Sequence, residues 1–204
     1  MSAAEWTALL VFCAAMSFSP GPNTTLSTAL AANYGLRRAL RFCAAVPAGW
    51  VLLMLGCGLG LGALILGVPA LRWGVKLLGI AYMVWLAWKL SRAAQLAQVD
   101  ARRLDVGFLA GMGMQFLNIK AWMLALTLTA GWVVNAAGAP STNPGERLAL
   151  ICAVMVVFAF TSNFTYALVG SLLRQFLAQG RRLLWFNRVL ALVLLLTAGW
   201  MAKV

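Results

Sequence analysis

The chain has 204 residues, of which 63% are hydrophobic and 10% are charged. This composition excludes an ordinary soluble domain and indicates an all-α, polytopic membrane protein. A net charge of +12 would suggest nucleic-acid binding in a soluble protein, but here the basic residues follow the ends of apolar segments, so we expect no nucleic-acid partner.

At ~20–25 residues per span, about six membrane helices fit this length. The apolar runs place them near residues 4–33, 42–67, 69–90, 106–132, 148–173 and 184–202. The first run is too long for a signal peptide, and neither Lys nor Arg precedes it. We therefore expect a single transmembrane transporter domain over 1–204, built from half one (1–98) and half two (99–204).

The first span contains a break, Ser19-Pro20-Gly21-Pro22-Asn23, inside a segment that carries no charge between Trp6 and Leu36. Each proline removes a helical hydrogen bond and disfavours helical geometry in the residue before it. Broken backbone at membrane depth is tolerated only where it is buried in protein or lines a cavity, and broken helices hold the substrate in transporters. Pro20, Gly21, Pro22 and Asn23 are therefore candidate substrate-binding residues.

Span two contains a glycine-rich segment, residues 56–62, whose small-xxx-small spacing predicts close packing of another helix. The four cysteines are scattered without a C-x-x-C pair, and the chain has no histidine. We therefore expect no metal site and no cofactor.

The connections between the expected spans carry basic residues unevenly. Eleven lie on one side and four on the other; by the positive-inside rule the eleven face the cytoplasm and both termini the periplasm. The eleven are Arg37, Arg38, Arg41, Lys89, Arg92, Arg102, Arg103, Arg174, Arg181, Arg182 and Arg188, and the four are Arg72, Lys76, Arg147 and Lys203.

Span four contains Gln115, Asn118 and Lys120 near its middle. A lysine buried in the membrane costs at least ~2.5–3.5 kcal/mol on insertion scales, so it usually has a function or a partner. The spans provide no Asp or Glu at that depth. Lys120 could bind an anionic substrate, be neutralised by carbonyls freed at the span-one break, or extend to an interface.

Span five adds Asn163 and Tyr166 to the candidate polar groups. Hydroxyls in membrane helices also bond their own backbone or a neighbouring helix, so those of spans one and five have that alternative. A helix starting after Pro22 would present N–H groups to a carboxylate, and freed carbonyls would accept from an ammonium. The set therefore suits a zwitterion.

Three spans per half give the halves opposite orientations, so an internal repeat would have to be inverted. Inverted repeats place binding sites where corresponding interrupted helices meet. We therefore expect two inverted three-helix halves with a broken first helix in each.

The S-P-G-P-N break at 19–23, Gly35, the G-I-A-Y-M-V-W-L-A-W-K segment at 79–89 and the Q-F-L-N-I-K segment at 115–120 carry a family likeness. Taken in this order, they resemble the lysine-exporter (LysE/RhtB) family of amino-acid exporters. Many members have Asn-Pro-Lys where this chain has Asn118-Ile119-Lys120. This form resembles the cysteine/O-acetylserine efflux branch, but without the proline the resemblance does not predict how strongly span four is broken.

The resemblance implies an inner-membrane exporter of small amino acids or their derivatives, driven by secondary active transport with protons as the candidate coupling ion. We expect no catalytic residues and no enzyme activity. The alternatives are an intramembrane hydrolase with a Ser19/Lys120 pair, or a channel or ion exporter. The partners are then the amino-acid substrate and the lipid bilayer, and a homo-oligomer is left open.

Overall fold

A computed structural model describes residues 1–93, 106–134 and 141–203. Arg102 and Arg103, two of the eleven basic residues counted on one side, lie outside these ranges, as do most of the connector between the expected halves and part of the loop before the expected span five. The described chain is nearly all helical, with these elements: α1 (Ala3–Phe18), α2 (Pro22–Tyr34), α3 (Leu36–Gly58), α4 (Leu61–Gly67), α5 (Pro69–Ser91), α7 (Phe108–Leu117), α8 (Ile119–Leu128), the π-helical turn η1 (Thr129–Val133), α9 (Pro144–Leu177) and α10 (Arg182–Lys203).

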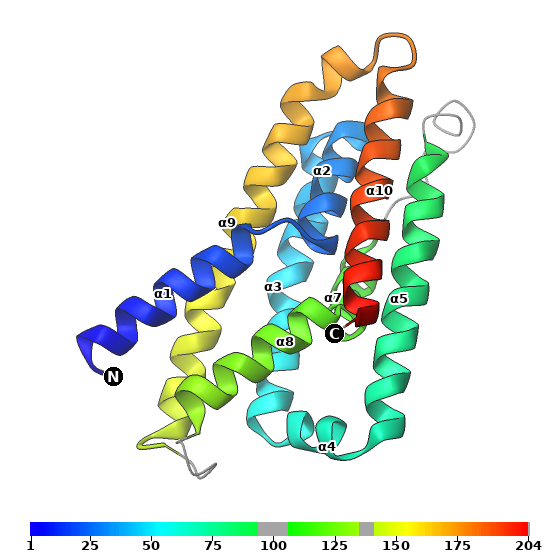
Figure 1. The fold of residues 1–204 in the computed structure, drawn as a ribbon. Coiled ribbons are helices and arrows are strands. Elements are labelled where there is room, and N and C mark those ends of the chain that lie inside the picture. Colours follow the sequence, from blue (N-terminus) through cyan, green and yellow to red (C-terminus); the bar gives the residue numbers. More distant parts are fainter. Residues whose placement is uncertain (94–105, 135–140, 204) are drawn as a thin grey trace.

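Four helices of the described chain, α3, α5, α9 and α10, are each long and apolar enough to cross a membrane. Two further segments reach that length only as bent pairs, α1 with α2 at 49° and α7 with the helix from Ile119 to Val133 at 70°. Figure 1 shows the four long helices as rods and both bends near the middle of the molecule. Within the described residues there are therefore four candidate membrane spans, or up to six if each bent pair is one span.

The expected span at 42–67 is wrong in its boundaries. The helix begins at Leu36 and ends at Gly58, and the chain then turns at Gly60 into the separate short helix α4. Gly60 has a φ of 101°, a left-handed conformation that favours glycine over every other residue. The glycine-rich run that predicts close packing thus also ends the helix.

The first break forms as the prolines predict. Helix α1 ends at Phe18, and the next residue, Ser19, has the extended backbone (φ −67°, ψ 137°) that is favoured before proline. Helix α2 then begins with Pro22 at its first position. The carbonyls freed by the prolines find protein partners: the Ser19 hydroxyl donates to Met16 O (2.9 Å) and the Tyr166 hydroxyl donates to Phe18 O (3.0 Å).

The second break forms without a proline. Asn118 leaves helical geometry (φ −94°, ψ 99°), and its own carbonyl accepts from the N–H groups that start α8. The Trp122 indole donates to the carbonyl of Phe116 at 2.9 Å, which replaces a lost helical bond. Gly79 of α5 packs directly on the Leu117 carbonyl, where an added Cβ would overlap that oxygen. A local hydrogen bond from Trp122 and a tertiary contact from Gly79 thus stabilise this break.

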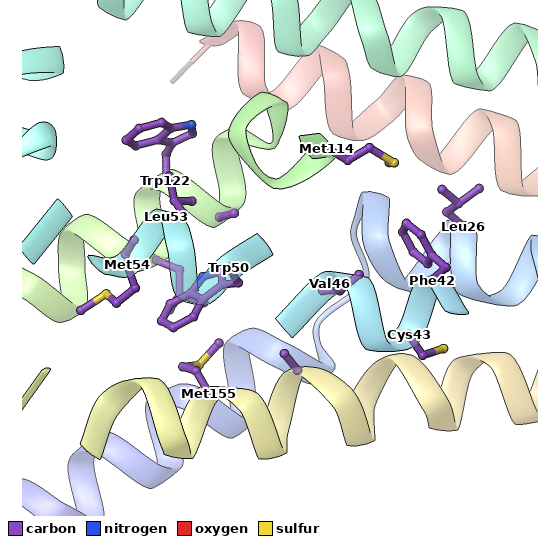
Figure 2. Packing of buried hydrophobic residues seen from close by; sticks show 14 of the residues in the cluster. Leu26, Phe42, Cys43, Val46, Trp50, Leu53, Met54, Met114, Trp122 and Met155 are labelled. Atoms are coloured by element: carbon purple, nitrogen blue, oxygen red, sulfur yellow. The ribbon is translucent and has the colours of Figure 1, made fainter. Parts of the chain in front are cut away.

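Helix α2 lies inside the bundle, where it contacts α3, α9 and α10 (Figure 1). Nearly all its residues from Thr24 to Ala32 are buried, including its hydroxyl-bearing ones. Gly170 of α9 packs against the carbonyl of Thr28, which lets the two helices approach closely. Figure 2 shows the core beside it, where side chains of α3 such as Phe42, Val46 and Trp50 project between the neighbouring helices.

Candidate functional site

The two breaks are bonded directly to each other. The Lys120 ammonium donates to the Ser19 carbonyl at 2.9 Å and to the Ser19 hydroxyl oxygen at 2.7 Å. The side-chain amides of Asn23 and Gln115 pair reciprocally, with N···O distances of 2.8 and 3.2 Å. Residues about 100 positions apart in the sequence thus form one polar junction at the centre of the bundle.

A cavity opens beside this junction. Its volume is about 50 Å³, several times the ~10–15 Å³ that one water molecule needs. Both breaks, α3 and α9 contribute to its wall. The lining residues are Met16, Ser17, Ser19, Gly21, Pro22, Asn23, Thr24, Val46, Trp50, Asn118, Lys120, Ala121, Leu124, Met155, Ala159, Ser162 and Asn163.

The electrostatics of the cavity favour a negative group. Helices α2 and α8 both begin at its wall, and a helix N-terminus carries a partial positive charge and free N–H groups. The ammonium of Lys120 lies in the same wall, and no Asp or Glu is among the lining residues. This combination can bind a carboxylate.

Six of the nine residues predicted from the sequence line the cavity: Gly21, Pro22, Asn23, Asn118, Lys120 and Asn163. The other three lie nearby with different contacts. Gln115 is fully buried behind the wall, where it binds Asn23 and the Gly111 carbonyl. Pro20 faces a separate apolar groove between α1, α8 and α10, and Tyr166 is bonded to the Phe18 carbonyl.

The predicted amide side chains differ in how far the protein satisfies them. Asn23 and Gln115 bind each other, and Asn163 accepts from the Ser27 hydroxyl (2.8 Å) while donating to the Ala159 carbonyl (2.8 Å). The Asn118 side-chain oxygen, by contrast, is buried and has no hydrogen-bond partner. The first three amides therefore have partners within the protein, whereas the side-chain oxygen of Asn118 has none.

The Lys120 ammonium binds a carbonyl at the first break, which is one of the three alternatives that the sequence leaves open. The side chain does not extend to an interface. Its ammonium has three N–H groups, and the Ser19 backbone and hydroxyl oxygens accept two of them. The third N–H group can donate to a ligand in the cavity. The contact to Ser19 therefore positions the ammonium without saturating it.

Trp50 is a cavity residue that the sequence does not single out. It lies in the middle of α3, is only 3% exposed, and its indole nitrogen has no hydrogen-bond partner. Figure 2 shows it projecting from α3, with Met155 of α9, another lining residue, close by. A signal was present, because tryptophans of membrane helices are enriched at the interfaces and Trp50 lies at the centre of a span.

Within residues 1–93, 106–134 and 141–203, no group of three or more His, Cys, Asp or Glu side chains is placed to hold a metal ion. The cysteines Cys13, Cys43, Cys57 and Cys152 are all buried and free.

Comparison with known proteins gives one family and a consistent set of relatives. The family model described as LysE type translocator matches residues 14–202. Relatives named cysteine/O-acetylserine efflux protein include that of Salmonella typhimurium (strain LT2), 30% identical over 96% of this chain and 94% of the relative. Those of Klebsiella pneumoniae (29%, 88% and 89%) and Escherichia coli O139:H28 (28%, 96% and 94%) carry the same name. No solved structure matches the chain.

Proposed function

The chain belongs to the family of LysE type translocators, and we propose that it exports small neutral amino acids or their close derivatives by secondary active transport across the bacterial inner membrane. The relatives named for cysteine and O-acetylserine efflux support this class of substrate. The observation that carries the proposal is the junction of two broken helices, which borders a cavity beside Lys120.

The substrate carboxylate would bind between the first turn of α2, where the backbone N–H groups follow Pro22, and the ammonium of Lys120. Both attract an anion, and transporters of other folds direct the N-termini of half-helices at anionic substrate groups in the same manner. Asn118 and Asn163 line the remaining polar wall. In this proposal Pro20, Asn23, Gln115 and Tyr166 shape and hold the breaks, which positions the binding groups.

The cavity volume supports a small substrate. About 50 Å³ is well below the ~300–1,000 Å³ typical of pockets for drug-sized ligands. The apolar part of the wall, with Met16, Val46 and Met155, would contact a short uncharged side chain. A second cationic group on the substrate would meet the Lys120 ammonium without a carboxylate to offset it.

We propose that the chain crosses the membrane six times as one domain, with halves 1–98 and 99–204 in inverted orientation and both termini in the periplasm. Two observations support this topology. The first helix is broken in each half, at Ser19 and at Asn118, and the two breaks contact each other. The basic residues Arg37, Arg92 and Arg174 follow alternate spans, as the positive-inside rule requires of one cytoplasmic side.

We propose protons as the coupling ion. Lys120 is the ionisable side chain in the cavity wall, so it or the substrate itself would have to carry the proton.

A transport assay tests the proposed function: purified protein in liposomes is supplied with a panel of labelled amino acids, with and without an imposed pH gradient. We expect gradient-stimulated transport of small neutral amino acids. Transport of none of them would refute the proposal, and transport indifferent to the gradient would refute proton coupling.

A serine hydrolase is the second candidate, favoured by the 2.7 Å contact between the Lys120 nitrogen and the Ser19 hydroxyl oxygen. In a Ser/Lys pair the lysine must accept the serine proton. Here the Ser19 hydroxyl donates to the Met16 carbonyl and the ammonium donates to Ser19. Ser19→Ala separates the two functions, because it would abolish hydrolysis but would leave the Ser19 carbonyl to bind Lys120 and thus preserve measurable transport.

A further inference from the structure

Two residues that line the cavity each carry a buried side-chain atom without a hydrogen-bond partner: the indole nitrogen of Trp50 and the side-chain oxygen of Asn118. The two residues are 3% and 6% exposed. Most buried polar side-chain atoms in proteins are paired, because an unpaired one loses its bonds to water without replacement. Two such atoms on residues of one cavity therefore favour a polar ligand that forms the missing hydrogen bonds.

The fold gives neither atom a structural task. The other buried indole in this region, that of Trp122, donates to the Phe116 carbonyl and thereby stabilises the second break. Asn118 occupies the position before α8 where an asparagine side chain commonly caps the helix, yet its side chain makes no capping bond. The described protein therefore satisfies neither hydrogen-bonding group.

The two atoms have opposite chemistry. An indole N–H can only donate a hydrogen bond, and an amide oxygen can only accept one. The ligand must therefore offer an acceptor to Trp50 and a donor to Asn118. The main-chain groups shared by all amino acids meet this requirement, since the carboxylate accepts and the ammonium donates.

We infer that Trp50 donates to the substrate carboxylate and that Asn118 accepts from the substrate ammonium. This inference rests on the proposed amino-acid export. It identifies the Trp50 indole nitrogen and the Asn118 side-chain oxygen as atoms that recognise the zwitterionic substrate. Trp50 then shares the carboxylate with Lys120 and the start of α2, which line the same cavity.

Asn118 offers a side-chain acceptor for the ammonium, whereas three carbonyls at the first break already have partners. The sequence suggests that carbonyls freed by the prolines would bind this group. In the structure those of Met16, Phe18 and Ser19 already accept from the Ser19 hydroxyl, Tyr166 and Lys120. The Asn118 side-chain oxygen is a buried acceptor without a hydrogen-bond partner, on a residue that lines the cavity.

This pairing predicts which analogues the protein rejects. A site that buries a hydrogen-bonding group discriminates strongly against ligands that lack the complementary group, because the buried atom then stays unpaired. Loss of the substrate ammonium should matter only while Asn118 retains its oxygen. Loss of the carboxylate should likewise mask the effect of removing the Trp50 donor.

The experiment measures inhibition of labelled L-cysteine counterflow in reduced proteoliposomes by L-cysteine, by cysteamine, which lacks the carboxylate, and by 3-mercaptopropionate, which lacks the ammonium. If the transport panel selects another small amino acid, that amino acid and its two corresponding analogues replace them. The variants are Trp50→Phe, which keeps an aromatic side chain but removes the donor, and Asn118→Leu, which removes the amide at similar size.

For Trp50→Phe we expect inhibition by L-cysteine and 3-mercaptopropionate to weaken roughly tenfold, with cysteamine unchanged. For Asn118→Leu we expect L-cysteine and cysteamine to weaken roughly tenfold, with 3-mercaptopropionate unchanged. Each variant provides an independent test if the other does not fold. Trp132→Phe is the matched control: its indole N–H donates to the Glu5 carbonyl at 3.3 Å and it is not a lining residue, so the variant should lower the melting temperature without changing the ratios between the three inhibitors.

If all three compounds inhibited both variants as they inhibit the parent, the inference would be overturned. That result would mean that water, and not the substrate, forms hydrogen bonds with the two atoms. Equal weakening for all three compounds would also overturn it, because that pattern indicates a change of shape. Parent protein that is inhibited by none of the panel amino acids would instead overturn the proposed function itself.

Discussion

Replacement of Lys120 by methionine removes the positive side chain from the cavity and tests the role proposed for it. The ammonium lies at the junction of the breaks, 2.9 and 2.7 Å from two oxygens of Ser19. Methionine has a similar length but no charge and no donor. If the ammonium binds the substrate carboxylate, transport must fall even though the protein folds.

The magnitude follows from the contact that is lost. A hydrogen bond to a charged group contributes about 1.5–3 kcal/mol, which corresponds to a loss of roughly 10- to 150-fold in transport efficiency. Folding should change little. Removal of a buried charge favours membrane insertion by about 2.5–3.5 kcal/mol, while a Ser19 carbonyl left without its donor costs about 1–3 kcal/mol. These two effects nearly cancel.

The assay compares initial rates of labelled amino-acid export in proteoliposomes, normalised to folded protein from size-exclusion chromatography. Lys120→Arg should restore little activity, because the rigid planar guanidinium needs a different geometry from the compact ammonium. Lys203→Met, at the exposed end of α10, is the matched control and should transport like the parent.

Near-parental export by Lys120→Met would refute the proposed contact with the substrate. If that variant kept its export per folded molecule but yielded much less folded protein, Lys120 would serve to hold the two breaks together through Ser19.

Three further predictions concern the topology, the first break and the helix packing. A reporter fused after Val204 should be active only if it is a periplasmic reporter; activity of a cytoplasmic one would contradict the six-span topology. The double variant Pro20→Ala/Pro22→Ala should insert normally but lose export, because a straightened helix would carry Ser19 away from Lys120, and unchanged export would make the break a packing feature only. Gly170→Leu should sharply lower the melting temperature, because its side chain would overlap the backbone of α2. A parental melting temperature would show that α2 and α9 do not pack as closely as described.

Local chemistry in the sequence determined the broken first span. Pro20 and Pro22 remove hydrogen bonds wherever the chain places them, so the end of α1 and the start of α2 were predictable from the residues alone. The same holds for the membrane class, which follows from apolar composition, and for Lys120 as a functional candidate, because its burial is costly in any fold.

The second break needed the tertiary structure. Asn118-Ile119 has no residue that forbids a helix, and the bend there is stabilised by Trp122 and by the approach of Gly79 from another helix. The end of span two at Gly60 lies between these cases, because glycine permits a left-handed turn without requiring one.

The separation of binding groups from structural ones also depended on tertiary contacts. In the sequence Asn23, Gln115, Asn118 and Asn163 are equivalent, since each is a costly amide inside a span. Whether an amide is available depends on which partner the fold brings to it, and that partner is often about 100 residues away. The tertiary structure alone paired three of them and left Asn118 free, and it turned the indole of Trp50 into the same cavity, because hydrogen-bond satisfaction is a property of the assembled bundle.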